Sequence, residues 1–218
     1  PVVARPDRVE VAERTLADGT ILAAVSPEEV AEKARALAEA GCEALCLFFV
    51  NGYANAANEA AAAEAARAVW PNPYVTAATE ILPEIREFER LSTATLNAYL
   101  QPLVASYLDR LETALGARGA TAEVLIVQSN GGVMSVETAR RTPVRTALSG
   151  PAAGVIAAQA IAEAAGFPNI VTCDMGGTSF DVSLVAEGEA ALAPQTAIDF
   201  GMVVRSPMIE ITTIRRAG

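Results

Sequence analysis

The 218-residue chain contains no histidine, and this absence excludes several classes of chemistry. Hydrolases of the Ser-His-Asp or Cys-His type need an imidazole as their general base, and many metal sites need an imidazole ligand. None of these sites can be assembled from this chain alone.

Cysteine is also scarce, and long apolar runs are missing. Cys42 and Cys46 lie in or beside an apolar run at 42–49, and Cys173 lies in a second apolar run. We interpret the three as small buried hydrophobic residues, not as a disulfide framework, so we expect a reducing compartment. The sequence has no apolar stretch of about 18 residues and no signal-peptide pattern. These absences predict a soluble, cytoplasmic protein without a membrane partner.

Basic residues are outnumbered, because 16 Lys and Arg face 26 Asp and Glu and give a formal net charge of -10. A broad nucleic-acid surface needs a basic stripe, so we expect no nucleic-acid partner. A local anion site made of backbone amides remains compatible with this charge. With 52% hydrophobic and 19% charged residues, the composition excludes intrinsic disorder.

The first third of the chain reads as an α/β pattern. Residues 8–25 predict two strands around a turn, and a helix follows that is capped by Ser26 and ended by Gly41. An apolar strand at 44–50, an alanine-rich helix to about residue 69 and a short strand at 74–78 complete a ββαβαβ order.

A long helix is predicted over 84–115, and the domain boundary is expected within 79–95. Apolar residues recur there every three or four positions, which is typical of one buried helix face, and Pro102 should kink or divide the helix. The apolar positions are Ile85, Phe88, Leu91, Leu96, Tyr99, Leu103, Tyr107, Leu111 and Leu115. Carboxylates at 84, 87 and 89 beside Arg86 and Arg90 are expected to form surface ion pairs on this helix.

A glycine-bearing turn at 174–181, Asp-Met-Gly-Gly-Thr-Ser-Phe-Asp, lies between two predicted strands. It has no lysine and no following helix, so it is neither a Walker A loop nor a dinucleotide fingerprint. Paired glycines let backbone amides approach a phosphate, and Asp174 could hold Mg²⁺ through water. The alternative interpretation is a tight hairpin with an Asp-capped turn.

Two further turns are candidates for anion contacts. In Ser149-Gly150-Pro151-Ala152-Ala153-Gly154, Ser149 or Gly150 can cap a helix whose N-terminus favours an anion, although close packing explains the same small residues. Ser129-Asn130-Gly131-Gly132 follows the end of a strand at 123–128, where ligands bind in open α/β sheets, or it is only a turn. Arg140, Arg141 and Arg145 form either a solvated face or a phosphate contact.

The order of these turns resembles the hydantoinase A / 5-oxoprolinase family, which includes N-methylhydantoinase A and acetone carboxylase beta-like subunits. Segments 86–100, 51–55 and 129–132 are similar to further signatures of that family, so the resemblance runs from about residue 8 to about residue 214. It implies an α/β fold of the actin-like and sugar-kinase-like ATPase type, built from ribonuclease H-like units. Residues 1–85 would then end the family's N-terminal region, and 86–218 would begin its hydantoinase A domain.

The resemblance also implies a function. Members are subunits of ATP-dependent ring-opening amidohydrolases or of acetone-type carboxylases, so it implies ATP and Mg as cofactors, a cyclic amide substrate and a hydantoinase B-like second subunit. Turn 174–181 would be the second phosphate loop, and the helix from Pro151 would connect the two lobes. Asp174 stays the residue expected to hold Mg through water. No catalytic residue is assigned. The residues expected to contact the nucleotide are Asp174, Gly176, Gly177, Thr178, Ser179, Asp181, Gly131, Gly132, Ser149 and Gly150.

The chain departs from the family pattern at several points. Residues 1–50 contain no first Gly-Gly-Thr phosphate loop, and the glycine-rich stretch expected after Ile214 is absent. We therefore expect a central fragment with negligible catalysis of its own. Phe180 replaces a hydroxyl residue, and Asn58 replaces a histidine before Glu59. A non-catalytic nucleotide-binding module and a small-acid or sugar kinase remain alternatives on the same fold.

Overall fold

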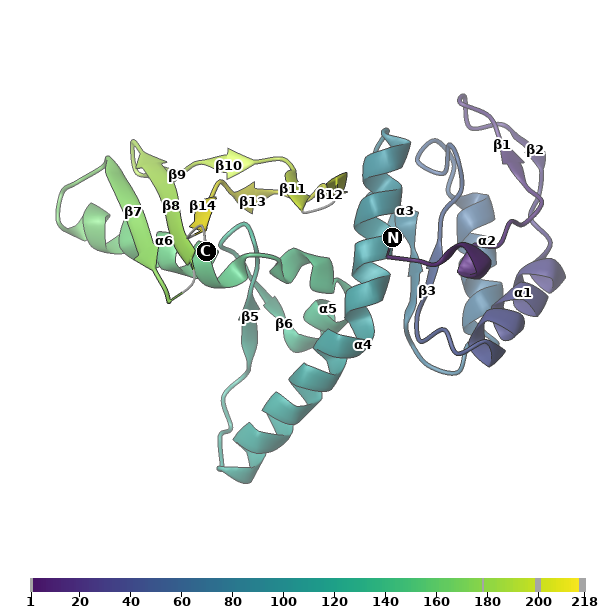
Figure 1. Ribbon diagram of the computed structural model, residues 1–218, viewed down its shortest axis with the longest axis horizontal. Coiled ribbons are helices and arrows are strands. Elements are labelled where there is room, and N and C mark those ends of the chain that lie inside the picture. The colour runs from purple at the N-terminus through teal and green to yellow at the C-terminus, as the bar shows by residue number, and fades with distance from the viewer. Residues whose placement is uncertain (1, 178, 199–200, 216–218) are drawn as a thin grey trace.

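The structure is a computed structural model, and it describes residues 2–177, 179–198 and 201–215. Figure 1 shows the long helix α4 (Glu87–Ala117) crossing the middle of the molecule. An N-terminal α/β unit lies on one side of it, and a part rich in strands lies on the other. None of the described helices combines the length and apolar character needed to cross a membrane.

The N-terminal unit has the predicted element order, with shorter strands than the sequence suggested. The elements are η1 (Arg5–Asp7), β1 (Arg14–Thr15), β2 (Ile21–Ala23), α1 (Pro27–Glu39), β3 (Leu45–Leu47), α2 (Ala57–Arg67), β4 (Val75–Ala77) and α3 (Ala78–Ile81). Strands β3 and β4 are parallel, whereas β1 and β2 form an antiparallel pair. The predicted cap is confirmed, because the Ser26 hydroxyl accepts a hydrogen bond from the Glu29 amide at 3.2 Å.

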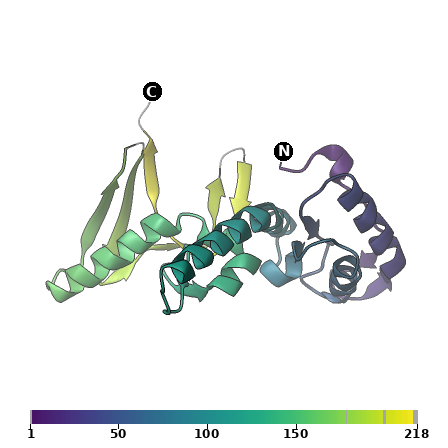
Figure 2. The same ribbon diagram turned by 90° about the horizontal axis from the view of Figure 1, so that it is seen from below.

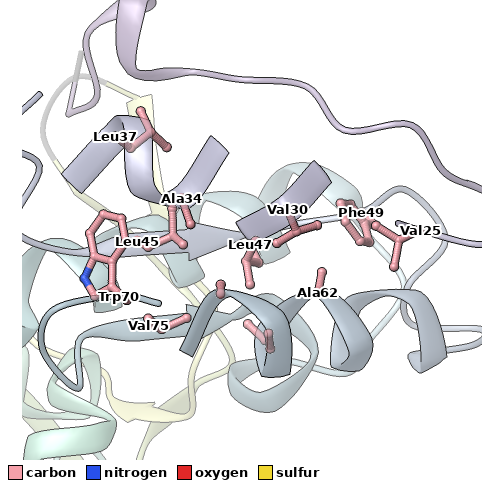
Figure 3. Close-up of a cluster of buried hydrophobic side chains, with 13 residues drawn as sticks. Val25, Val30, Ala34, Leu37, Leu45, Leu47, Phe49, Ala62, Trp70 and Val75 are labelled. Carbon is pink, nitrogen blue, oxygen red and sulfur yellow. The ribbon is translucent and has the colours of Figure 1, made fainter. Parts of the chain in front are cut away.

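The core of this unit lies between the two helices and the β3–β4 pair (Figure 3). Helix α2 contributes alanines at 62, 63 and 66 that are almost completely buried. Because alanine has a short side chain, the helix can approach α1 and the strands closely. Trp70 and Phe49 fill the two ends of the same cluster, so the alanine-rich segment has a packing role.

Helix α4 meets one sequence-based expectation and contradicts another. It continues through Pro102 without being divided, and Figure 1 shows its axis bending about halfway along, which agrees with the predicted kink. The prediction of the buried apolar face is largely wrong, since Phe88, Tyr99 and Leu103 are exposed to solvent. The opposite face is buried instead, and its residues include Arg90, Thr93, Ala94, Asn97, Gln101, Ala105 and Leu108.

Hydrogen bonds explain why a polar face of α4 is turned inward. The side-chain amides of Asn97 and Gln101 donate to the Arg141 carbonyl at 3.0 and 3.2 Å. The Asn97 amide also donates to the Thr76 hydroxyl on β4 at 3.1 Å, and Thr93 accepts from the Arg205 amide at 2.9 Å. Backbone groups that α4 covers need such partners, and apolar side chains could not supply them.

The strand-rich part follows α4. Its elements are β5 (Leu125–Val127), β6 (Val133–Ser135), α5 (Val136–Arg141), η2 (Pro143–Thr146), α6 (Ser149–Ala164), β7 (Ile170–Met175), β8 (Ser179–Ala186), β9 (Glu189–Ala190), β10 (Leu192–Ala193), β11 (Thr196–Ile198), β12 (Met202–Val204), β13 (Met208–Ile209) and β14 (Thr212–Arg215). The main sheet has the antiparallel order β14-β8-β7, and β9 pairs with β8. Helix α6 lies along this sheet (Figure 2). Val155 of α6, Val185 of β8 and Ile209 of β13, a strand outside this sheet, belong to one buried cluster.

The three free cysteines are expected to react with a disulfide reagent in a defined order. Burial raises the pKa of the Cys46 thiol to about 12, and burial also raises the pKa of Cys42. The expectation that all three are buried is wrong for Cys173, which is exposed, whereas Cys42 and Cys46 are half-buried. Only the thiolate is nucleophilic, so Cys173 should react first and Cys46, with a pKa of about 12, should react last. Ellman's reagent at pH 8, with and without urea, measures this order, and three equal rates in the folded protein would contradict the raised pKa of Cys46.

Candidate functional site

An open groove of about 510 Å³ lies between α6 and the β7–β8 strands. Its α6 wall includes Pro151, Gly154 and Val155. Its sheet wall includes Asp174 and Asp181, the two carboxylates that bracket the glycine turn. The fold therefore brings one end of the turn at 149–154 to the two carboxylates of the turn at 174–181. The other described residues predicted to contact a nucleotide at these turns do not line the groove; they are Ser149, Gly150, Gly176, Gly177 and Ser179.

Asp174, Asp181 and Thr213 form a row across the sheet. Asp174 on β7 is directly opposite Asp181 on β8, and Asp181 is directly opposite Thr213 on β14. Directly opposed residues share a face of the sheet, so the three side chains lie side by side. The Thr213 hydroxyl donates to Asp181 Oδ1 at 2.6 Å.

Gly154 explains how α6 can cross beside this row. A Cβ atom added to Gly154 would lie 4.0 Å from Asp174 Oδ2, so the carboxylate faces the helix at this point. Any larger side chain would extend toward the Asp174 carboxylate and occupy the groove. The small residue therefore keeps space open next to the acidic row.

The acidic row suits a hard cation. Two carboxylates directly opposite each other repel, and the Thr213 hydroxyl relieves only one of the four carboxylate oxygens. Mg²⁺ is typically bound by one or two carboxylates together with waters and phosphate oxygens. Within 2–177, 179–198 and 201–215, no group of three or more His, Cys, Asp or Glu side chains could hold a metal. Two carboxylates and a hydroxyl at an open groove fit Mg²⁺ better than a closed structural metal site.

One backbone amide of the glycine turn is already used in a hydrogen bond within the hairpin. The Gly176 amide donates to the Ser179 carbonyl at 3.0 Å, so this amide does not face outward to a phosphate. Gly177 is exposed, and a Cβ added there would meet no atom within 4 Å. Ser179 begins β8 and is half-buried, and Thr178 lies outside the described residues. A phosphate contact at this turn therefore stays a prediction that depends on the Gly177 end.

Helix α6 begins differently from the sequence expectation. Leu148 is the N-cap residue in a left-handed conformation, with φ of 59°, and no side chain caps this end. Ser149 and Gly150 are the first two helical residues, so the expected cap role of either one is wrong. Pro151 occupies the third position, where its missing N–H needs no intrahelical partner.

Gly131 and Gly132 lie in the turn between β5 and β6, and neither lines the groove. Gly131 has φ of 82°, and a Cβ there would lie 2.5 Å from Cγ1 of Ile156 on α6. The Gly132 amide donates to Asn130 Oδ1 at 2.9 Å. Turn geometry and close packing account for both glycines, and their predicted nucleotide contact remains a prediction.

The basic residues between these turns contact protein groups. Arg140 bonds to Asp109 and Glu112 on α4, both at 2.5 Å, and these bonds raise the pKa of Arg140. Arg141 and Arg145 are exposed, and their backbone carbonyls accept bonds from Asn97 and Ser129. The solvated-face interpretation therefore describes Arg140 better than a phosphate contact.

The sequence interpretation missed a buried ion pair. Arg90 was expected on the surface of α4, yet Arg90 and Glu59 are both 0% exposed, with Nη1 and Oε2 3.9 Å apart. Glu87 also contacts Arg90 at 2.8 Å, whereas the Arg86–Glu89 pair does lie at the surface. The sequence did contain a signal for this buried polar face, because polar residues recur at 90, 93, 97 and 101 with helical spacing.

Asn58, which replaces an expected histidine, connects α2 to β2. Its Oδ1 accepts from the Val25 amide at 3.1 Å, and its Nδ2 donates to the Ala23 carbonyl at 3.0 Å. The same Nδ2 donates to Glu13 at 2.9 Å. Within the described residues Asn58 therefore has a structural role next to buried Glu59.

Comparisons with known proteins match both halves of the chain to one family. Residues 90–218 match the Hydantoinase/oxoprolinase family model, and residues 1–70 match the model of the Hydantoinase/oxoprolinase N-terminal region. The chain is 31% identical over 218 residues to the caprolactamase subunit alpha of Pseudomonas jessenii, which covers all of this chain and 31% of that subunit. It is 30% identical over 196 residues to the acetone carboxylase beta subunit of Xanthobacter autotrophicus, which covers 88% of this chain and 27% of that subunit.

Solved structures of related enzymes resemble the fold of this chain. The ATP-dependent caprolactamase from Pseudomonas jessenii matches with a TM-score of 0.82 and 31% identity over 94% of this chain and 29% of that chain. Nucleotide-free acetone carboxylase matches with a TM-score of 0.77 and 27% identity, again over 94% of this chain and 29% of that chain. These matches confirm the expected α/β, actin-like ATPase fold. The chain spans about a third of the length of these relatives.

Proposed function

The chain belongs to the hydantoinase/oxoprolinase family, and we propose that it forms part of the nucleotide-binding body of an ATP-dependent subunit that opens cyclic amides. The observation that carries this proposal is the Asp174–Asp181–Thr213 row beside the open groove under α6. Relatives named as a caprolactamase and, in Saccharomyces cerevisiae, as a 5-oxoprolinase support a cyclic amide as the substrate class.

The residues of this chain would hold the phosphate end of the nucleotide. Bound ATP and Mg²⁺ would supply the activating phosphoryl group for an amide oxygen. Asp174 and Asp181 would hold the cation, since carboxylates facing phosphates need a bridging positive charge. The Gly177 end of the turn is open to a phosphate, whereas the Gly176 amide is already bonded.

The chain alone should contribute binding and little turnover. It spans about a third of its relatives, and one phosphate loop cannot neutralise a triphosphate and its transition state. Because relatives are named as alpha, beta and gamma subunits, we propose a second subunit of the hydantoinase B type as partner. The three free thiols support a reducing, cytoplasmic location.

Substitution of Asp174 tests the site directly. Asp174→Asn should weaken Mg-ATP binding at least tenfold, because the cation loses a charged ligand. In the absence of Mg²⁺ the same variant should be as stable as the parent or slightly more stable, by about 0.2–1 kcal/mol, because a like-charge cross-strand pair is removed. Isothermal calorimetry and urea unfolding measure the two effects.

Asp109→Asn is the matched control, since Asp109 is an exposed aspartate on α4 outside the groove. It should leave Mg-ATP binding unchanged. If Asp174→Asn lowers stability and leaves nucleotide binding intact, the turn at 174–181 is a structural hairpin and the proposal fails.

A carboxylase subunit is the second candidate function. The acetone carboxylase beta subunit is almost as similar to this chain as the caprolactamase subunit, at 30% against 31% identity. ADP release by the assembled enzyme separates the two. Release that depends on a lactam or hydantoin supports ring opening, and release that depends on a ketone with bicarbonate supports carboxylation.

A further inference from the structure

The hydroxyl of Thr213 holds one oxygen of the acidic row described above. Thr213 lies on β14, and its Oγ1 donates to Asp181 Oδ1 at 2.6 Å. The strand order β14-β8-β7 places Thr213 and Asp174 on opposite sides of Asp181. The bond therefore holds Oδ1 toward β14 and leaves Oδ2 of Asp181 for another partner.

The pairing of β14 does not depend on this bond. Strand β14 pairs with β8 along its whole length. The Ser183 hydroxyl also donates to the Glu210 carbonyl at 2.7 Å, which holds the chain just before β14. The bond between Thr213 and Asp181 is exposed, and a bond between groups that water can also solvate contributes little to stability. Its main effect is on the direction of the Asp181 carboxylate.

Threonine is well suited to orient a carboxylate next to a cation. Its branched Cβ restricts χ1, so the hydroxyl keeps one direction on the strand. The hydroxyl also carries no charge. A lysine or arginine in this place would neutralise Asp181 and compete with a cation for its oxygens. Thr213 can therefore occupy one oxygen of Asp181 and leave the negative charge of the row unchanged.

The number of free oxygens on Asp181 bears on which cation fits. Ca²⁺ takes six to eight oxygen ligands in flexible geometry and often binds both oxygens of one carboxylate. Mg²⁺ demands near-ideal octahedral geometry, and the two oxygens of one carboxylate lie too close together for angles of about 90°. Since Oδ1 already accepts from Thr213, Asp181 can offer a cation only Oδ2. This arrangement suits the smaller ion.

We propose that Thr213 is a positioning residue that restricts Asp181 to one oxygen and makes the row prefer Mg²⁺ over Ca²⁺. The inference rests on the proposed function, because it takes Asp174 and Asp181 as the cation site. Thr213 acts through Asp181 and does not itself bind the ion. Without the hydroxyl, Asp181 can turn both oxygens to a cation, and the larger ion gains a ligand.

Competition against Mn²⁺ measures this preference on the chain without nucleotide. The electron paramagnetic resonance signal of free Mn²⁺ falls as the ion binds, and added Mg²⁺ or Ca²⁺ restores it by displacement. The chain has a net charge of -10, so some weak binding elsewhere is expected. The part of Mn²⁺ binding that Asp174→Asn removes defines binding at the row.

Thr213→Val should lower the ratio of Mg²⁺ affinity to Ca²⁺ affinity roughly fivefold or more, because Asp181 is released. Valine has a similar shape and favours strands, so β14 should stay paired. Thr213→Ser keeps the hydroxyl and should hold the ratio within about twofold of the parent. Thr213→Ala is a second variant without a hydroxyl, and circular dichroism identifies any variant that is not folded.

Thr212→Val is the matched control. Thr212 precedes Thr213 on β14, is exposed, and lies opposite Val182 on the other face of the sheet. This variant loses the same hydroxyl group from the same strand, so it should leave the ratio unchanged.

Two results would overturn this inference alone, provided that Asp174→Asn still removes Mn²⁺ binding. One is an unchanged ratio in Thr213→Val. The other is an equal loss of affinity for both cations, which would show that Thr213 only supports the strand. Equal Mn²⁺ binding by the parent and by Asp174→Asn would overturn the cation site itself, and the proposed function with it.

Discussion

Arg90→Met is expected to lower the free energy of unfolding by about 3–5 kcal/mol, because it leaves a carboxylate buried without its counter-ion. Glu59 is 0% exposed, and Arg90 is the cation within 4 Å of it among the described residues. Methionine replaces the aliphatic part of the arginine side chain but not its charge.

The contacts of the pair explain the size of the effect. Glu59 accepts hydrogen bonds from the amides of Phe49 and Thr79, which follow β3 and β4, at 3.0 and 2.5 Å. Arg90 Nη2 donates to the Phe49 carbonyl at 2.6 Å, and the guanidinium lies 4.7 Å from the centre of the Phe48 ring. Arg90 Nη1 has no hydrogen-bond partner among the described residues, so its attraction to Glu59 at 3.9 Å is electrostatic.

Urea unfolding with linear extrapolation measures the loss. Arg86→Met is the control, because Arg86 is the N-cap residue of α4 and its exposed guanidinium pairs with Glu89; its loss should be at most about 1 kcal/mol. The double variant Glu59→Gln/Arg90→Met should be more stable than Arg90→Met alone, because the unpaired charge is gone. Equal losses for Arg90→Met and Arg86→Met would show that the buried pair contributes nothing beyond a surface pair.

Gly131→Ala is expected to lower the free energy of unfolding by about 2–4 kcal/mol, from two separate causes. A residue other than glycine at φ of 82° is strained by about 1 kcal/mol. The new methyl group would also lie 2.5 Å from Cγ1 and 2.7 Å from Cδ1 of Ile156, and such overpacking costs roughly 1–3 kcal/mol.

Gly119→Ala isolates the backbone contribution. Gly119 has φ of 76°, and a Cβ there would meet no atom within 4 Å, so its loss should be only about 1 kcal/mol. In the background of Ile156→Ala, Gly131→Ala should cost less than in the parent, because the atoms that clash are gone. Equal melting temperatures for Gly131→Ala and Gly119→Ala would mean that α6 moves away from the β5–β6 turn without cost.

Local signals in the sequence predicted the order of helices and strands well. They did not predict which face of a helix is buried or which distant residues it contacts. Ser26 and Glu29 identify the start of α1 because a cap is made within one turn of the chain. The apolar periodicity of α4 was read correctly, but periodicity defines two faces without saying which is inside. Here the buried face has to donate hydrogen bonds to the carbonyl of Arg141 and to the hydroxyl of Thr76, and both residues are distant from Asn97 in the sequence.

The same distinction applies to the candidate site. Asp174 and Asp181 could be selected as candidates because a glycine turn between two strands is a short-range pattern, and the sheet register places them opposite each other. Thr213 was not assigned, since β14 joins the row from more than thirty residues away. The close packing of Gly131 against Ile156 of α6 was not predicted, because Ile156 lies 25 residues further along the chain. The nucleotide contact expected at Gly131 stays a prediction.

The position of Glu59 has a consequence for cooperativity. Its carboxylate is held by segments that follow β3 and β4 and by a side chain of α4, so three stretches of the chain must assemble before its charge is compensated. A division of the protein at residues 85 and 86 would separate Glu59 from Arg90. The N-terminal unit and the first turns of α4 should therefore unfold in a single transition. Probes placed in either segment should give the same unfolding midpoint.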